Sequence, residues 1–370
     1  MNMNVYLPTR LMTGKGIIDK QSHLLKGLGN KCLVITDATG AKVSGALDDV
    51  VAALNKEGIA YTLFEGITQN PKLTECMDAA KVAIAQDVDF LIGIGGGSPL
   101  DAAKCTAVLA ANKGMDQAGL YSLKWPVHPL PVVAVGTTAG TGSEVTKVSV
   151  ITNLEGFKKS FNHDTIYPTL SYGDPTYTTK LPDYFTRSTA IDALAHCVES
   201  YFNANANEIS RAYAVRGVQL LIPMFKKIIA QGTEALTYDD REQLYNASLF
   251  GGMAINVTGT ALPHTVGYLM TEDYGLPHGI ACAVFLPVFA SINKKADPDL
   301  YAAFLKAIDL TEEDYLSMID GMMPDYSVTM TKEEVAHAHN RWINNGSLNK
   351  CITTVTADEV DAILTRMFVK

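Results

Sequence analysis

The first half of the chain alternates between two kinds of hydrophobic pattern. Short apolar runs rich in β-branched residues predict buried strands, and longer segments with apolar residues three or four apart predict helices. The predicted strands are KCLVITD, AYTLFEG, DFLIGIG and LPVVAVGT, and the helical segments are AKVSGALDDVVAALNKEG, KLTECMDAAKVAIAQD and SPLDAAKCTAVLAAN. Strands that are apolar on both faces and alternate with helices are typical of a mostly parallel sheet covered by helices. The pattern therefore predicts an α/β domain.

After about Leu181 the strand signals fade and long helical periods take over. The helical segments are TRSTAIDALAHCVESYFN, ISRAYAVRGVQLLIPMFKKIIAQG, YDDREQLYNASLFGGMAIN and TADEVDAILTRMF. The last of these opens with Thr356 and carries Glu359 three residues later, which predicts a capping box at its start. A chain of 370 residues exceeds the size of one hydrophobic core. We therefore expect two domains, an α/β domain at 1–180 and an all-helical domain at 181–370.

The composition limits the partners and the compartment. A net charge of −9 argues against a nucleic-acid or anionic-membrane partner, because either would call for a basic face. Six cysteines without a CxxC pair fit neither a zinc-thiolate site nor a disulfide framework, which favours a reducing cytoplasm. The amino terminus lacks the pattern of a secretory signal, and the apolar run from Gly279 to Ile292 is too short to cross a bilayer. We therefore expect a cytoplasmic protein that acts on a small molecule.

A glycine-rich turn joins the predicted strand DFLIGIG to the following helix. Gly95, Gly96 and Gly97 allow a ligand to approach the backbone closely. Ser98 is a good N-cap, and Pro99 suits the first helical position. Amides at the start of a helix bind anions, so this turn is suited to the pyrophosphate of a dinucleotide. The alternative is a turn used only for packing.

A second loop of small residues, GTTAGTGSE at 136–144, follows the strand LPVVAVGT. Two such loops in one sheet favour nucleotide binding, and the absence of GK[ST] from both disfavours a P-loop ATPase. The acid that contacts the ribose should follow the first loop, but the candidate here, Asp37 at the end of KCLVITD, precedes it. Asp101 lies in the first turn of the next helix, where it would repel a phosphate that it faced.

One carboxylate and three imidazoles form a candidate metal site. Asp192 and His196 are four residues apart on a predicted helix and therefore share one face. His264 and His278 each follow a proline and could supply the other half from a helix end and a turn. This set suits Fe, Zn, Ni or Co and can leave a position open for substrate. The alternative is an exposed helical pair and two turn residues.

Three neighbouring groups bear on this assignment. Cys197 adjoins His196 but lies about 100° round the helix, so it should not share the same ion. Glu199 either supports a ligand or is solvated. His337 and His339, in EEVAHAHNRW, are expected to be surface residues.

The chain resembles the iron-dependent (group III) alcohol dehydrogenase family over nearly its whole length. The motifs that carry the resemblance are GGGSPLDAAK at 95–104, GTTAGTGSEVTK at 136–147, DPTYTTKLPDYFTRSTAIDALAHCVESY at 174–201, and PHG at 277–279 with His264 before it. The resemblance implies the dehydroquinate synthase-like architecture, with an α/β amino-terminal dinucleotide-binding domain, an all-α carboxy-terminal domain, and the metal in the cleft between them.

The resemblance also assigns site residues. The implied metal ligands are Asp192, His196, His264 and His278. The implied cofactor-binding residues are Asp37, Gly96, Gly97, Ser98, Asp101, Thr137, Thr138, Ser143, Lys159 and Leu181. The register at Lys159 is loose, because Lys158 is adjacent.

The implied activity is the reversible, NAD(P)-dependent oxidation of a primary alcohol to an aldehyde. Iron(II) is the expected metal, with zinc as the alternative, and the resemblance suggests a homo-oligomer, a dimer or larger. Asp37 should bind the ribose hydroxyls and repel a 2′-phosphate, which favours NAD over NADP.

One position departs from the pattern of many family members. They carry a second histidine four residues after the one matched by His264, whereas this chain has Tyr268. Aldehyde reductases of the phosphono- and sulfo-acetaldehyde type resemble the chain more closely here, which hints at a short anionic aldehyde. A packing role for Tyr268 is the alternative.

Three other functions stay open from the sequence. A polyol dehydrogenase of the glycerol type is the nearest. A lyase resembling dehydroquinate synthase should carry a crowd of basic residues, which the motifs lack. A non-enzymatic NAD-binding structural or filament protein would bind the nucleotide without turnover.

Overall fold

The computed structural model describes residues 3–343 and 345–369. The chain forms two compact units. The α/β unit consists of Tyr6–Leu181 and Thr237–Tyr245, and the helical unit consists of Pro182–Leu236 and the chain from Asn246, together with the residues before Tyr6. The chain passes from one unit to the other between Leu181 and Pro182. It returns once to the α/β unit, for Thr237–Tyr245, and a single domain boundary near residue 180 does not predict this return.

The return segment packs against the α/β unit through a buried tyrosine, Tyr245. The Tyr245 hydroxyl donates a hydrogen bond to Glu144 at 2.8 Å, and the ring lies against Gly173, where a Cβ would meet it at 2.5 Å. Helix α10 (Tyr238–Thr258) therefore begins in one unit and ends in the other. This contact joins residues about 100 apart in sequence, so no local pattern predicts it.

In the described part of the α/β unit, six parallel strands form one sheet in the order β1-β8-β5-β4-β2-β3. The strands are β1 Arg10–Thr13, β2 Lys31–Thr36, β3 Ala60–Phe64, β4 Phe90–Gly95, β5 Val132–Gly136 and β8 Leu170–Gly173. The helices are α1 Ile17–Lys20, α2 His23–Lys26, α3 Gly40–Ser44, α4 Ala46–Lys56, α5 Leu73–Gln86, α6 Gly97–Ala111 and α7 Gln117–Tyr121. A separate antiparallel hairpin pairs β6 Val148–Thr152 with β7 Lys158–Asn162.

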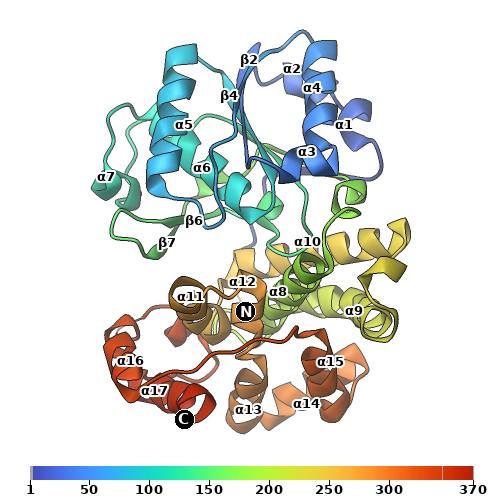
Figure 1. The fold of residues 1–370 in the computed structure, drawn as a ribbon, viewed down its shortest axis with the longest axis vertical. Coiled ribbons are helices and arrows are strands. Elements are labelled where there is room, and N and C mark those ends of the chain that lie inside the picture. The colour runs from blue at the N-terminus through green and yellow to red at the C-terminus, as the bar shows by residue number, and fades with distance from the viewer. Residues whose placement is uncertain (1–2, 344, 370) are drawn as a thin grey trace. The chain divides into compact units, whose positions relative to one another are not determined.

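Both faces of the sheet are buried, as the continuous apolar runs predict. In β2, Leu33 and Ile35 join a core with helices α5 and α6, whereas Cys32 and Val34 join a core with α1 to α4. Figure 1 shows these two groups of helices on opposite sides of the strands. Because side chains alternate along a strand, each strand contributes residues to both cores. The sheet is packed on both faces, and the carboxyl ends of its parallel strands lie along one edge.

The sequence did not foresee the short elements of this unit. β1 and β8 are four residues each; β1 is stabilised by pairing with β8, and β8 pairs with both β1 and β5. The single helix expected after β2 is broken at Gly45, which adopts φ 89° and separates α3 from α4. Four-residue strands carry too few positions for a periodic signal.

The helical unit contains no strand longer than an isolated bridge among the residues described. Its helices are α8 Asp183–Tyr201, α9 Glu208–Gln231, the end of α10, α11 Leu262–Tyr274, α12 His278–Ala283, α13 Leu286–Ala296, α14 Pro298–Ile308, α15 Glu312–Met322, α16 Lys332–Ala338 and α17 Ala357–Phe368. The predicted capping box of Thr356 and Glu359 is confirmed at the start of α17. Helix α8 packs against α9 and α12 at the centre of this unit.

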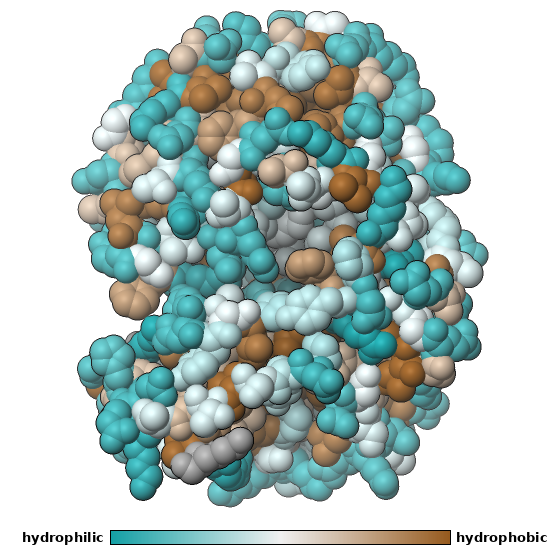
Figure 2. Space-filling model, in the orientation of Figure 1, coloured by the Kyte–Doolittle hydropathy of each residue, from teal (hydrophilic) through white to brown (hydrophobic). Residues whose placement is uncertain are grey.

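The segment His278–Ala296 is the one stretch in the described chain that is long and apolar enough to cross a membrane. It consists of two helices, and 61% of its most apolar window is buried within the protein, so it is a core segment. Figure 2 shows hydrophilic and hydrophobic residues interspersed over one face of the molecule.

Candidate functional site

The four predicted metal ligands all lie in the helical unit, and three of them, Asp192, His264 and His278, offer ligand atoms within 4.8 Å of one another. Asp192 and His196 lie one turn apart on α8, and their exposed fractions are 2% and 4%. His264 lies in the first turn of α11, behind Pro263, and is equally buried. His278 is the first residue of the short helix α12 rather than part of a turn. Prolines at the helix starts thus fix where both histidines enter the core.

The spacing of these side chains suits a single cation. Asp192 Oδ1 lies 3.4 Å from His264 Nε2, and neither buried atom makes a hydrogen bond of normal geometry. Two ligands about 2.1 Å from a tetrahedral ion lie roughly 3.4 Å apart. The His264 ring stacks on His196 with centroids 4.5 Å apart, and its centroid is 5.1 Å from that of His278. The buried, unpartnered donors therefore fit a divalent metal.

Glu199 fixes the orientation of His264. Its Oε1 accepts a hydrogen bond of 2.5 Å from Nδ1 of His264 and another of 3.2 Å from the backbone N–H. Its Oε2 accepts from the N–H of Ala261. Since the carboxylate accepts at Nδ1, the neutral ring carries its lone pair on Nε2, the nitrogen that faces Asp192. Of the two roles left open for Glu199, the structure shows the supporting one.

The charges of this site are strongly coupled. Burial alone would raise the pKa of Asp192, but His196 and the other imidazoles hold that pKa well below its ordinary value. Burial would lower the pKa of His264, but the sulfur of Cys282 and the carboxylate of Glu199 raise it well above its ordinary value. The site therefore favours positive charge, as a cation-binding site does.

The glycine of the PHG motif permits close packing of two helices. A Cβ on Gly279 would lie 1.9 Å from the carbonyl oxygen of Ser188 and 2.9 Å from Cβ of Asp192. Only a residue without a side chain lets α12 approach α8 at this point. The close approach sets His278 beside Asp192.

Cys282 is a member of the cluster that sequence reasoning missed. Ligand atoms of Asp192, His264, His278 and Cys282 all lie within 4.8 Å of one another. The signal was present, because Cys282 follows His278 by four residues and so shares its helix face. Cys197, by contrast, points away toward Gly217, where a Cβ would meet its sulfur at 2.5 Å.

In the α/β unit, the two predicted nucleotide loops lie in contact at the carboxyl ends of β4 and β5. A Cβ on Gly96 would come within 3.1 Å of the Thr138 side chain, and a Cβ on Gly97 within 2.8 Å of Thr141. Gly96, Gly97, Ser98 and Thr138 are only half-buried. A ligand could therefore reach these backbone amides, as an anion site requires.

The start of α6 differs from the prediction by two residues. Gly96 is the N-cap and the helix begins at Gly97, so Ser98 and Pro99 lie inside the first turn. The Ser98 hydroxyl accepts instead from the N–H of Asn70 at 3.2 Å. The expected N-cap role of Ser98 is wrong, because the helix begins before this residue and its hydroxyl oxygen accepts from a neighbouring loop.

Three of the predicted cofactor residues point into the protein. Asp101 accepts hydrogen bonds from the Ser143 hydroxyl at 2.6 Å and from the N–H of Val150 at 2.9 Å. The buried Lys104 ammonium donates to the Ser143 hydroxyl at 2.7 Å. Thr137 is buried, and its N–H donates to the carbonyl of Gly95. Asp101, Ser143 and Thr137 thus tie the two loops together, and their direct contact with a cofactor stays a prediction.

Asp37 lies at the carboxyl end of β2, beside β4. Its Oδ1 accepts from the N–H of Thr39 at 2.8 Å and from that of Gly40, the first residue of α3. The side chain is half-buried. The prediction that Asp37 contacts the ribose is compatible with this place, because its edge of the sheet is shared with the glycine loop.

The remaining predicted cofactor residues lie farther along the unit. The Lys159 ammonium lies 4.3 Å from the centroid of the Tyr121 ring, whereas Lys158 is on the opposite face of β7. Lys158 and Lys159 therefore point to opposite faces of β7, although the sequence alone did not decide between them. Leu181 is the last residue before the chain leaves the α/β unit.

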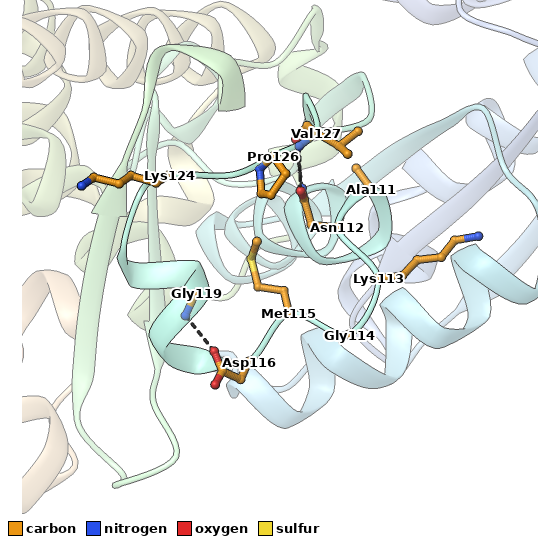
Figure 3. Close-up of a pocket in the computed structure, with 10 residues that line it drawn as sticks. All are labelled: Ala111, Asn112, Lys113, Gly114, Met115, Asp116, Gly119, Lys124, Pro126 and Val127. Atoms are coloured by element: carbon orange, nitrogen blue, oxygen red, sulfur yellow. Dashed lines mark hydrogen bonds between the residues drawn. The ribbon is translucent and has the colours of Figure 1, made fainter.

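An open hollow of about 710 Å³ lies on the α/β unit, away from these loops. Figure 3 shows Asn112, Met115 and Asp116 among the residues that line it. The Asp116 carboxylate accepts from the N–H of Gly119, and the Asn112 amide oxygen accepts from that of Val127. Its polar groups hold the local loop, and none of the predicted site residues lines it.

A parallel α/β unit with two small-residue loops at its strand ends, together with a buried carboxylate–imidazole cluster, is the combination expected of a metal-dependent oxidoreductase that uses a dinucleotide. The family description "Iron-containing alcohol dehydrogenase" matches residues 8–175, and the description of its C-terminal domain matches residues 186–360. The chain belongs to the iron-containing alcohol dehydrogenase family.

Three relatives illustrate the family. The 1,3-propanediol dehydrogenase of Klebsiella pneumoniae is 33% identical over 81% of this chain and 76% of its own. The iron-containing alcohol dehydrogenase of Thermotoga maritima is 31% identical, covers 99% of each chain and superposes with a TM-score of 0.90. The sulfoacetaldehyde reductase of Bifidobacterium kashiwanohense, solved with NAD+, is 26% identical, covers 99% of each chain and has a TM-score of 0.87.

Family membership confirms the class of reaction. The protein is an NAD-linked alcohol dehydrogenase or aldehyde reductase that acts on a small alcohol or aldehyde. The lyase and the non-enzymatic structural protein are therefore set aside.

Proposed function

We propose that this enzyme reduces a short aldehyde with NADH, reversibly, at a divalent metal held by Asp192, His196, His264 and His278. The observation that carries the proposal is the pair of buried atoms, Asp192 Oδ1 and His264 Nε2, which lie 3.4 Å apart without hydrogen bonds. Buried polar atoms are normally paired, so an unpartnered pair of this spacing indicates a cation-binding site.

The protein groups supply position and charge. Iron(II) at this site would supply Lewis acidity toward the carbonyl oxygen. Asp192 supplies one full negative charge, and Glu199 holds His264 in the tautomer whose Nε2 can donate a lone pair. Asp192 and His264 are each 98% buried, so bulk water has little access to their donor atoms. A bound nicotinamide would supply the hydride to the carbonyl carbon, so no protein nucleophile is required.

We propose NAD rather than NADP as the preferred cofactor. Asp37 already carries a negative charge beside the glycine loop, and its Oδ1 is occupied by the turn that follows β2. Its second oxygen can accept from a ribose hydroxyl but would repel a 2′-phosphate.

The proposed substrate is a short aldehyde with a polar tail. One relative is named for 1,3-propanediol, a short alcohol with a second polar end, and another for sulfoacetaldehyde, a short aldehyde with an anionic tail. The Tyr268 ring lies parallel to the His278 ring, with centroids 5.7 Å apart and an angle of 18° between planes. We propose that Tyr268 occupies the place of the second family histidine and holds the His278 ring against the site.

The test is the rate of NADH oxidation by iron-loaded enzyme against three sets of aldehydes: short neutral, phosphonylated and sulfonylated. Glycerol and 1,3-propanediol in the reverse direction represent the polyol alternative. We expect turnover with at least one short aldehyde, and loss of turnover in His264→Ala with NADH still bound, as followed by nicotinamide fluorescence. Turnover by chelator-treated His264→Ala protein would contradict the proposed metal site.

We further propose that the enzyme is a cytoplasmic homo-oligomer. The cysteine pattern and acidic charge support the compartment, and family resemblance supports the assembly. Light scattering during gel filtration measures the mass, and a single-chain mass of 39.9 kDa would contradict the oligomer. Cell fractionation measures the compartment, and recovery outside the cytosolic fraction would contradict it.

A further inference from the structure

The site contains a buried thiol that takes no part in the proposed reaction. Cys282 is fully buried on α12, one helical turn after His278. Its Sγ lies 3.7 Å from Nδ1 of His278 and 4.0 Å from Nε2. A sulfur 2.3 Å from a tetrahedral ion and an imidazole nitrogen about 2.1 Å from it are roughly 3.6 Å apart. The sulfur is therefore spaced as a donor to the same ion.

Two independent observations point to a ligand at this sulfur. The unpartnered atoms Asp192 Oδ1 and His264 Nε2 belong to side chains that are each 97% buried, and each of these two side chains offers a ligand atom within 4.8 Å of Cys282 Sγ. Among the cysteines of the described chain, Cys282 is also the one that gathers with a carboxylate and imidazoles. His196, the fourth implied ligand, contacts the cluster by stacking on His264 but is not part of this set of mutually close donors.

We propose that Cys282 Sγ binds the metal directly, as a sulfur donor added to the nitrogen and oxygen donors of the site. The inference rests on the proposed function, because it concerns the same ion. On binding, the thiol proton leaves to solvent and the thiolate takes its place on the metal. A thiolate is a soft ligand, so it raises the affinity for zinc and cobalt(II) relative to magnesium or manganese.

The experiment uses the full-length protein, freed of metal by chelation and then loaded with cobalt(II). Cobalt(II) bound to a thiolate gives a near-ultraviolet charge-transfer band that oxygen and nitrogen donors do not give. We expect this band in the wild type and its loss in Cys282→Ser and Cys282→Ala. Residues that only orient a ligand are typically worth 10- to 100-fold in metal affinity, so loss of a direct donor should lower the zinc affinity at least ~10-fold in both variants. Cys197→Ser, in an equally buried thiol turned away from the cluster, should keep the band and the affinity.

The outcomes separate this inference from the proposed function. Wild-type protein that binds cobalt(II) and reduces an aldehyde but lacks the band would overturn the inference and leave the function intact. A band that survives in Cys282→Ser and Cys282→Ala would overturn it as well. A band that depends on Cys282 in a protein that reduces no aldehyde would leave the inference standing and refute the function. If both variants fail to fold, the wild-type spectrum alone tests the inference, because absence of the band there would overturn it.

Discussion

Replacing Glu199 by glutamine tests whether the buried carboxylate prepares His264 for the metal. Glu199 accepts three hydrogen bonds, from Nδ1 of His264, from the backbone N–H of His264, and from the N–H of Ala261. Glutamine has the same shape but only one acceptor oxygen, so its NH₂ group must face at least one of these donors. The carbonyl oxygen can keep both His264 donors only if the NH₂ group faces the N–H of Ala261, so the hold on the tautomer that leaves Nε2 with its lone pair is weakened.

The size of the effect follows from the role of the residue. Partners that orient a metal ligand are typically worth 10- to 100-fold in metal affinity, which is about 1.4 to 2.8 kcal/mol. We expect a loss in this range for Glu199→Gln. The apoprotein should also lose about 1–3 kcal/mol of stability, because a buried donor is left without an acceptor.

The assay is a competition titration of zinc or iron(II) between the apoprotein and a chromophoric chelator. The control is Glu144→Gln, which alters an equally buried carboxylate that accepts from Tyr245 in the α/β unit. That variant should bind the metal as the wild type does. If folded Glu199→Gln also binds the metal with unchanged affinity, the reasoning about the tautomer is refuted.

Three further predictions follow from the packing and the charges. Asp37→Gly should narrow the preference for NAD by raising kcat/KM for NADP, and an unchanged ratio would count against the ribose role of this carboxylate. Gly279→Ala should cost about 1–3 kcal/mol or more and should also weaken metal binding, because its Cβ would lie 1.9 Å from the Ser188 carbonyl oxygen. Normal zinc affinity in that variant would show that α12 can shift freely. Lys104→Met should cost about 3–5 kcal/mol in chemical denaturation, because it leaves the carboxylate of Asp101, 3.7 Å away, without its buried cation. A denaturation midpoint equal to that of the wild type would contradict this.

The sequence predicts the sheet where the signal is local. β2 and β4 are continuous apolar runs, and both are found at the expected residues. β1 and β8 are short, and they exist because each finds a neighbouring strand from a distant part of the chain. β1 and β8 pair although they are more than 150 residues apart in sequence, and the local sequences RLMT and LSYG carry no periodic pattern that predicts this pairing.

The site shows the same division between local and distant causes. The spacing of Asp192 and His196 predicts a shared helix face, and the structure shows both buried on α8. Glu199 could not be assigned, because its partner His264 is 65 residues later and no local pattern places α11 against that face. Asp101 looked equally able to face a ligand, and only the contacts with Ser143 and Val150, more than 40 residues on, turn it inward.

The unpartnered pair at Asp192 and His264 links the enzyme's lifetime to the supply of its ion. Each buried polar atom without a partner costs the empty fold about 1–3 kcal/mol. The occupied fold escapes that cost and gains further stability as free metal rises above its dissociation constant. Proteases act on the transiently opened chain, so iron starvation should shorten the half-life of this protein as well as lower its turnover.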